Sequence, residues 1–148
     1  MIILIFLLIA APITVFIHEL GHALGSYLMK ADKIELNIGA GPKLFSIQNR
    51  KWTICIYIFY MLGAHTASER YPYFSKTEQI VISAFGPLLN GVIGLIVQQW
   101  NPVDHLGISQ LFALFNLWLF FINLIPFRIG GKQSDGYTIL QKILTKKG

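Results

Sequence analysis

The chain has 148 residues, of which 54% are hydrophobic and only 13% are charged. Soluble domains carry about 25% charged residues, so this composition argues against a soluble protein and for an integral membrane protein of one domain. The net charge of +5 would suit a nucleic-acid-binding protein, but the sequence has no basic helix and no aromatic-basic patch of the kind that recognises nucleic acid.

Three apolar segments, at about residues 1–29, 77–100 and 108–127, are long enough to cross a bilayer. About 20 helical residues, each rising about 1.5 Å, span a hydrocarbon core of about 30 Å. The first segment has no preceding positive region and no clear small-residue cleavage site, so we interpret it as a span and not as a signal peptide. We therefore predict a mainly α, three-transmembrane-helix core within a single domain over residues 1–148.

The region between the first two spans contains predicted β-structure at about residues 33–62. Residues 33–38 alternate polar and apolar side chains, and residues 52–62 are rich in aromatic and β-branched residues. Turns separate these segments. Because an open sheet edge cannot face lipid, we expect a membrane-associated β-hairpin or sheet at the interface or against the helices. Such a sheet either pairs with an extended substrate or merely covers the cytoplasmic end of the bundle.

The twelve basic residues indicate the orientation of the chain. Seven lie between the first and second spans and five follow the third, whereas none precedes His18 or falls in Gln98–Gly107. The positive-inside rule places the basic regions in the cytoplasm. We therefore expect a multi-pass protein of the cell membrane with its N-terminus and the loop Asn101–Gly107 outside and its C-terminus cytoplasmic. The use of Lys, Ile and Asn indicates a bacterial source.

The motif His18-Glu19-Leu20-Gly21-His22 lies inside the first apolar segment. Positions i and i+4 share one face of a helix, so both imidazoles can bind one metal ion, with Glu19 beside it to activate water. Ionisable residues are costly in hydrocarbon and usually mark function. The motif predicts a zinc hydrolase that works in the bilayer, near its cytoplasmic face.

Catalytic zinc usually has three protein ligands, so the motif needs a third. Cys55 is the only cysteine, which excludes a cysteine-based zinc site. Asp104 lies outside by the topology above, whereas Asp135 follows the third span on the same side as the motif and is the best candidate. Three further candidates remain: Glu69, Glu78 and His65.

Each predicted span carries or precedes a motif. These are His18-Glu19-x-x-His22, then Gly86-Pro87-Leu88-Leu89-Asn90, then Asn123-Leu124-Ile125-Pro126 followed by Asp135-Gly136. Their order over nearly the whole chain resembles the site-2 protease family of intramembrane zinc metalloproteases (M50-type), and the β-region is similar to that family's membrane-associated β-region. In the family the aspartate follows the proline closely, as Leu-Asp-Gly; here residues 127–134 intervene and Ser134 replaces the leucine.

The resemblance implies one catalytic Zn²⁺ held by His18, His22 and Asp135, with Glu19 as the catalytic acid/base. It also implies that Asn90 and Asn123 bind substrate or support the site, although either asparagine also suits an interhelical hydrogen bond. The implied function is that of an intramembrane zinc metalloendopeptidase. It would hydrolyse peptide bonds in or near transmembrane segments, in regulated intramembrane proteolysis or in cleavage of signal-peptide remnants.

The implied partners are a membrane-spanning protein or peptide substrate and the lipid bilayer; a homo-oligomer is compatible with the sequence, and nucleic acid is not expected. An alternative function is that of a catalytically silent zinc-binding membrane protein, which acts as a binding or immunity module. A protease of the prenyl-protein type would need a glutamate as third ligand on a later helix, and no glutamate follows Glu78.

Overall fold

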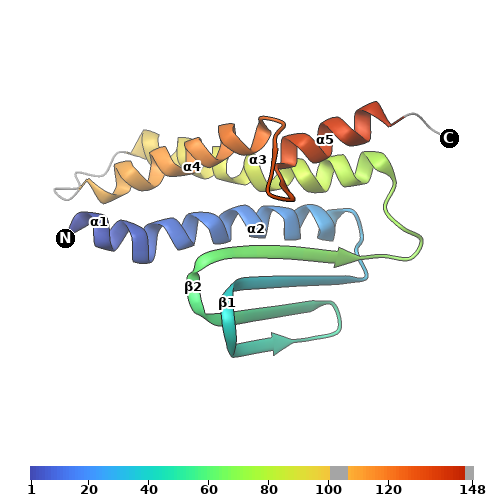
Figure 1. Ribbon diagram of the computed structural model, residues 1–148, viewed down its shortest axis with the longest axis horizontal. Coiled ribbons are helices and arrows are strands. Elements are labelled where there is room, and N and C mark those ends of the chain that lie inside the picture. Colours follow the sequence, from blue (N-terminus) through green and yellow to red (C-terminus); the bar gives the residue numbers. More distant parts are fainter. Residues whose placement is uncertain (101–106, 146–148) are drawn as a thin grey trace.

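The computed structural model describes residues 1–100 and 107–145 and is mainly helical. The first helical stretch consists of α1 (Ile2–Ile5), the π-helical turn η1 (Phe6–Ala10) and α2 (Ala11–Leu28). The later helices are α3 (Lys76–Trp100), α4 (Ile108–Leu124) and α5 (Asp135–Leu144). The N-terminus, the end of α3 and the start of α4 lie at one end of the molecule, and α5 lies toward the other (Figure 1).

Two helical stretches are long and apolar enough to cross a membrane, judged by length and composition: Ile2–Leu28 and α3. α4 is apolar but has only 17 residues, a rise of about 26 Å against about 30 Å of hydrocarbon. It covers residues 108–124 of the predicted span 108–127 because Ile125 is extended, with ψ 126°, as favoured before a proline. Of the predicted outer loop, residues 101–106 lie outside the described part.

The β-region is a bent hairpin of two long strands, β1 (Lys33–Gln48) and β2 (Trp52–Glu69). β1 bends at Gly39 and Gly41, whose φ angles of +90° and +89° suit glycine. Ile34 pairs with both Trp52 and Ser68, so the start of β1 lies between the two parts of β2. The sheet thus extends beyond the predicted residues 33–62, and the last part of β2 lies nearest to α2 (Figure 1).

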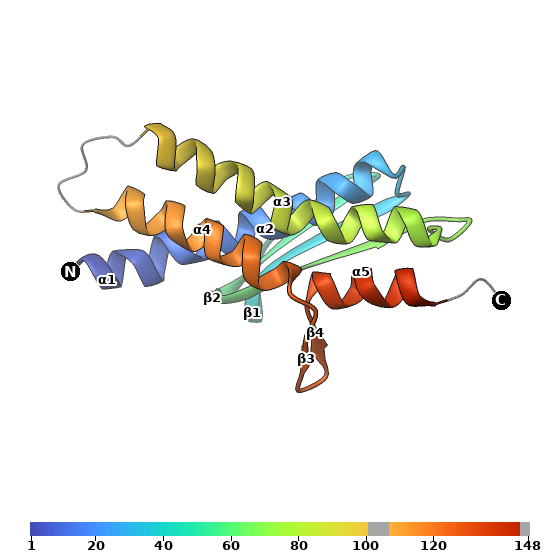
Figure 2. The same cartoon turned by 90° about the horizontal axis from the view of Figure 1, so that it is seen from above.

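A second, much smaller hairpin precedes α5. Its strands are β3 (Arg128–Ile129) and β4 (Lys132–Gln133), joined by Gly130 and Gly131 at φ angles of +56° and +82°. The hairpin projects away from the helices (Figure 2).

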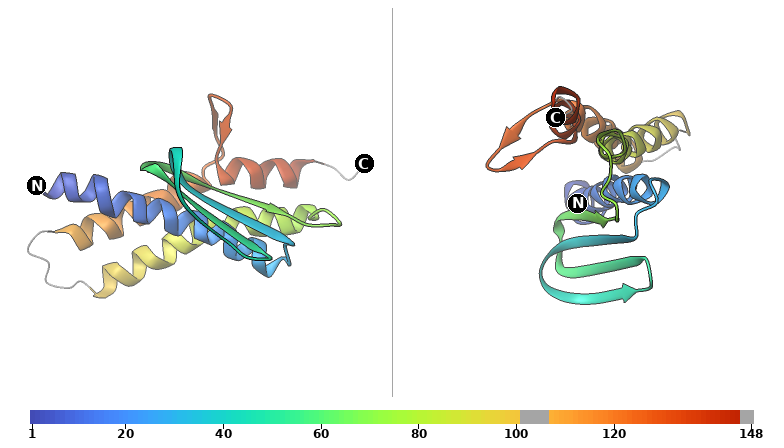
Figure 3. Two further views of the ribbon diagram at one scale, coloured as in Figure 1. Left: turned by 90° about the horizontal axis from the view of Figure 1, so that it is seen from below. Right: turned by 90° about the vertical axis from the view of Figure 1, so that its right-hand side faces the viewer.

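α2 is the central layer of the fold. The sheet covers one side of it, and α3 to α5 lie on the other (Figure 3). Small residues allow α2 and α3 to pack closely, because a Cβ on Gly21 would overlap the carbonyl oxygen of Phe85. Exposed apolar side chains occur on the first helical stretch, on α3 and on α4, among them Leu7, Val92 and Trp118. The fold therefore keeps its close contacts around α2 and leaves much apolar surface facing outward.

Candidate metal centre

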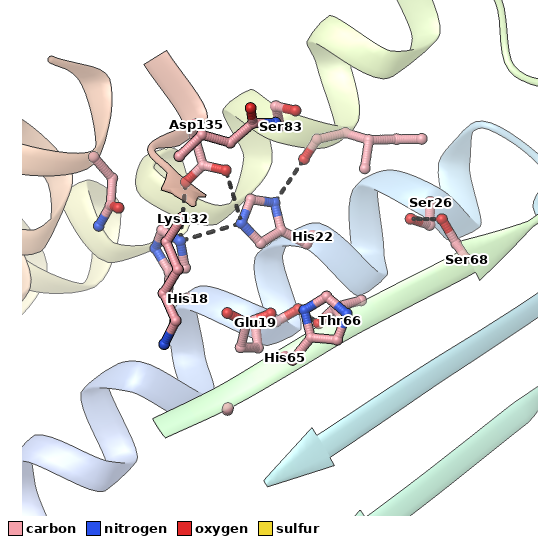
Figure 4. A pocket seen from close by; sticks show the side chains of 14 residues that line it. His18, Glu19, His22, Ser26, His65, Thr66, Ser68, Ser83, Lys132 and Asp135 are labelled. Carbon is pink, nitrogen blue, oxygen red and sulfur yellow. Dashed lines mark hydrogen bonds and ion pairs between the residues drawn. The ribbon is translucent and has the colours of Figure 1, made fainter. Parts of the chain in front are cut away.

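The two histidines of α2 meet the first residue of α5. The Nε2 atoms of His18 and His22 lie 3.1 Å apart. Asp135 places Oδ2 3.1 Å from His18 Nε2 and Oδ1 3.3 Å from His22 Nε2 (Figure 4). Two histidines one helical turn apart and an aspartate from a distant part of the sequence thus point two imidazole nitrogens and a carboxylate at one another.

This spacing fits a tetrahedral zinc ion. Bonds of about 2.0–2.1 Å in a tetrahedron place neighbouring ligand atoms about 3.3–3.4 Å apart, close to the distances among His18, His22 and Asp135. His22 Nδ1 lies 2.9 Å from the carbonyl oxygen of Ile82, which can only accept, so Nδ1 carries the proton and leaves Nε2 free to bind a metal. The donor set therefore suits Zn²⁺.

Asp135 is suited to the ligand role in its charge as well as its position. Burial raises the pKa of its carboxyl, but hydrogen bonds and charge attraction from His18 and His22 in their protonated form outweigh this effect and hold the pKa below its ordinary value. A metal cation in place of those protons would favour the ionised carboxylate in the same way.

The segment 127–134 does not keep Asp135 from the site, because it closes at its base. Ser134 N donates to the carbonyl oxygen of Phe127 at 3.0 Å, and Phe127 N donates to Ser134 Oγ at 3.1 Å. Ser134 Oγ also donates to the carbonyl oxygen of Ile125 at 2.7 Å. The two ends of the small hairpin are therefore hydrogen-bonded to each other, so its strands do not separate Asp135 from the end of α4.

The start of α5 is fixed by the residues on either side of Asp135. Ser134 is the N-cap of the helix, and its Oγ accepts from Tyr137 N at 3.1 Å. Gly136 lies so close to the end of α4 that a Cβ there would overlap the carbonyl oxygen of Leu124. These contacts place the Asp135 carboxylate against the histidines of α2.

Glu19 lies beside this cluster in an open cavity of about 670 Å³. The potential ligand atoms of His18, Glu19 and His22 all lie within 4.8 Å of one another. Asp135, and not Glu19, contacts both imidazoles, so Asp135 is the better placed of the two to be a third ligand. Within the described residues no hydrogen bond or ion pair holds the Glu19 carboxylate, so it is free to contact a molecule in the cavity.

The other predicted candidates for the third ligand lie elsewhere or contact neither imidazole. Glu78 accepts two hydrogen bonds from Arg70, at 2.6 and 2.7 Å. Glu69 lines a separate cavity together with Asp32 and Arg70. His65 lies on β2 and lines the cavity of the metal centre, next to Glu19 and Thr66 (Figure 4).

The two predicted supporting asparagines occupy different positions. Asn123 lines the cavity, and its Nδ2 donates to the carbonyl oxygen of Leu119 at 3.0 Å. Asn90 is fully buried behind His18 and is not part of the cavity wall; its Oδ1 lies 2.8 Å from His18 Nδ1. Any effect of Asn90 on a bound substrate would therefore pass through the imidazole.

Eight residues that line the cavity were not among the predicted ones, and four polar ones show why. Lys132 and Gln133 belong to the small hairpin, whose position directly before Asp135 was the signal that could have found them. Ser83 comes from α3 and Thr66 from β2, where its Oγ1 donates to the backbone oxygen of Glu19 at 2.9 Å. No sequence pattern marks these two, because only the packing of α3 and β2 against α2 brings them to the cavity.

Comparisons with known proteins agree with this chemistry. The model of peptidase family M50 matches residues 5–101, which contain the histidine motif and Asn90 but not Asp135. A protein of Thermotoga maritima is 31% identical over 111 residues, covering 66% of this chain and 22% of its own length. One of Fusobacterium nucleatum is 46% identical over 39 residues, covering 26% and 12%. Both carry "Putative zinc metalloprotease" in their names, and this chain spans less than a quarter of either.

Proposed function

Because the chain belongs to peptidase family M50, the site-2 protease family, we propose that it is an intramembrane zinc metalloendopeptidase. It would hydrolyse peptide bonds in or near transmembrane segments of membrane proteins. The observation that carries this proposal is the convergence of His18, His22 and Asp135 at 3.1–3.3 Å beside Glu19. The zinc metalloprotease names of the relatives support the same metal and a protease role.

The residues of the cavity suit peptide hydrolysis. Zinc held by His18, His22 and Asp135 would supply a Lewis acid and lower the pKa of a water molecule towards about 7. Glu19 accepts a proton from the water whose oxygen attacks the carbonyl carbon of the peptide. Glu19 then donates that proton to the amine nitrogen as the carbon–nitrogen bond breaks.

The apolar surface supports a position of this site within the bilayer. His22 lies six residues before the end of α2 at Leu28, a rise of about 9 Å. Tyr60, near the bend of the sheet, donates from its hydroxyl to the backbone oxygen of Leu8 at 3.1 Å. The bend, with exposed Phe59, therefore lies beside the N-terminal part of the same long helix, where a spanning helix would be in lipid.

The protein would be multi-pass, with its N-terminus outside and its C-terminus cytoplasmic.

A transmembrane substrate has to unwind before cleavage, because a helix engages its carbonyl groups in its own hydrogen bonds. The segment Ala64–Ser68 of β2 suits the unwound form. It pairs with Ile34–Ile38 on one side, and four of its residues line the cavity on the other. An extended substrate segment would add to this edge as a further strand and present its backbone to Glu19.

The test is cleavage of membrane reporter proteins by the full chain. Candidate single-span reporters, with Gly or Pro in the span, are co-expressed with the wild type, with Glu19→Gln, or with Glu35→Gln as a matched control outside the cavity. Glu19→Gln should bind zinc but abolish cleavage, because an amide cannot accept the proton; Glu35→Gln should cleave normally. Cleavage by Glu19→Gln at the wild-type rate would refute the catalytic assignment.

A further inference from the structure

A chain of polar side chains from three helices lies behind the metal centre. Thr14 of α2, Asn90 of α3 and Asn116 of α4 are each 0% exposed. None of them lines the cavity of the metal centre. Burying such groups costs free energy unless they are hydrogen-bonded, and the described residues include no buried side-chain polar atom without a partner. These three residues therefore form a complete hydrogen-bonded set.

The donor and the acceptor of each hydrogen bond can be identified by starting from the backbone carbonyl groups at the end of the set farthest from His18. Asn116 Nδ2 lies 2.8 Å from the carbonyl oxygen of Phe112, which can only accept. Thr14 Oγ1 donates its single proton to the carbonyl oxygen of Ala10 at 2.9 Å, so it accepts from Asn116 Nδ2 at 3.2 Å. The amide nitrogen of Asn116 therefore faces Thr14, and its Oδ1 faces Asn90.

The orientation of the Asn116 amide fixes the orientation of the Asn90 amide, which in turn decides which nitrogen of His18 carries the proton. Asn90 Nδ2 donates to Asn116 Oδ1 at 2.8 Å and to the backbone oxygen of Thr14 at 3.1 Å. A flipped amide would put Oδ1 against these two oxygens, so Oδ1 points to His18 Nδ1, 2.8 Å away. Nδ1 then carries the proton, and Nε2 keeps the lone pair that faces His22 and Asp135.

We propose that Asn116 and Thr14 are positioning residues, which act through Asn90 to hold His18 in the tautomer that binds metal. This role rests on the proposed function, because it matters only if His18 is a zinc ligand. It also explains why His18 needs more support than His22. The partner of His22 is the Ile82 backbone carbonyl, which cannot flip, whereas the partner of His18 is a side-chain amide that can.

The experiment measures zinc affinity of the full chain in detergent, by competition with a chelator of known affinity. Asn116→Leu should weaken zinc binding about tenfold, within the range of 10–100-fold that is typical of changes behind a ligand. Thr14→Val keeps the shape of threonine but removes its hydroxyl, and it should weaken binding in the same direction. Thr14→Ser keeps the hydroxyl and should retain the zinc affinity of the wild type.

Two further measurements separate positioning from general damage. Melting of each variant in excess chelator reports the fold without metal. The ¹⁵N shifts of His18 report its tautomer, which should change from Nδ1-protonated in the wild type to a mixture in Asn116→Leu. Wild-type zinc affinity and an unchanged tautomer in both Asn116→Leu and Thr14→Val would overturn the proposal. A wild type that binds zinc but cleaves no reporter would instead count against the proposed proteolysis and leave the positioning role intact.

Discussion

Gly86 is a residue whose missing side chain makes room for His22, one of the proposed metal ligands. A Cβ at this position would overlap the imidazole of His22, at Cε1 and Nε2. Gly91, on the same helix, faces the ring of Phe120, the nearest ring atom lying 2.9 Å from such a Cβ. A ring at the end of a flexible side chain can shift, whereas His22 is held between Ile82 and Asp135.

Gly86→Ala should therefore reduce zinc affinity by at least tenfold, because the added methyl group displaces His22 from the other ligands. Gly91→Ala is the matched control on α3 and should leave zinc affinity within about twofold, with the cost of a moved Phe120 ring appearing only in stability. Chelator competition on both purified variants provides the comparison. Equal zinc affinity in the two variants would show that the space beside His22 is not required.

At this scale the sequence pointed to the proposed ligands but not to the residues that hold them in place. The i, i+4 spacing in a helix was enough to pair His18 with His22, and the distribution of basic residues pointed to Asp135. The hydrogen bond between Asn116 and Thr14 joins residues 102 positions apart. Such a contact depends on how α4 packs against α2, which no local pattern encodes.

Ser134 links two elements, the small hairpin and α5. It is the N-cap of α5, and its hydroxyl also bonds to Phe127 N and to the carbonyl oxygen of Ile125 at the start of the small hairpin. Ser134→Ala should destabilise the start of α5 by about 1 kcal/mol, within the range of about 0.5–2 kcal/mol for a lost N-cap. Because Asp135 is the next residue, the variant should also bind zinc more weakly.

The tip of the hairpin offers the control for Ser134→Ala. Gly131→Ala introduces strain at a φ of +82°, but a Cβ there has no described neighbour within 4 Å. Gly131→Ala should therefore leave zinc affinity unchanged, while Ser134→Thr, which retains the hydroxyl, should stay closer to the wild type than Ser134→Ala does. Weaker zinc binding in the tip variant would mean that the hairpin itself, and not its base, holds Asp135.

The β-region shows which strand residues could not be predicted from residue type and alternation alone. Residues 33–38 and 52–62 have the alternation or the residue types of strands, and the structure has strands there. Residues 63–69 are small and polar, with little β-branched or aromatic character. They are a strand because they pair with the start of β1, as in Thr66 with Leu36. This segment, which also lines the cavity, could be found only from the pairing.

For the whole molecule, the position of Asp135 constrains the path of α4. α4 begins near the end of α3 and returns alongside it, so that α5 can reach the histidines of α2 (Figure 2). If α3 crosses the bilayer, α4 has to return to the depth of His22, but not to the far end of α3. Its 17 residues are sufficient for this shorter path.

Fusion reporters can test the resulting topology. Green fluorescent protein after Gly148 should fluoresce and alkaline phosphatase there should be inactive, because the basic residues after α4 favour the cytoplasm. Alkaline phosphatase fused after Trp100 should be active, as expected for a chain that has just crossed outward through α3. Active phosphatase at both points would mean that α4 does not cross back.

The closed base of the small hairpin has a consequence for how related proteins are recognised and for how this one can be labelled. We expect that residues added or removed at the hairpin tip would not move the Asp135 carboxylate, provided that Phe127 and Ser134 still bond to each other. A search pattern with a fixed short interval between the proline and the aspartate would therefore overlook this chain. The same tolerance makes Gly130-Gly131 a natural insertion point for an epitope or a fluorophore that reports on the site from outside it.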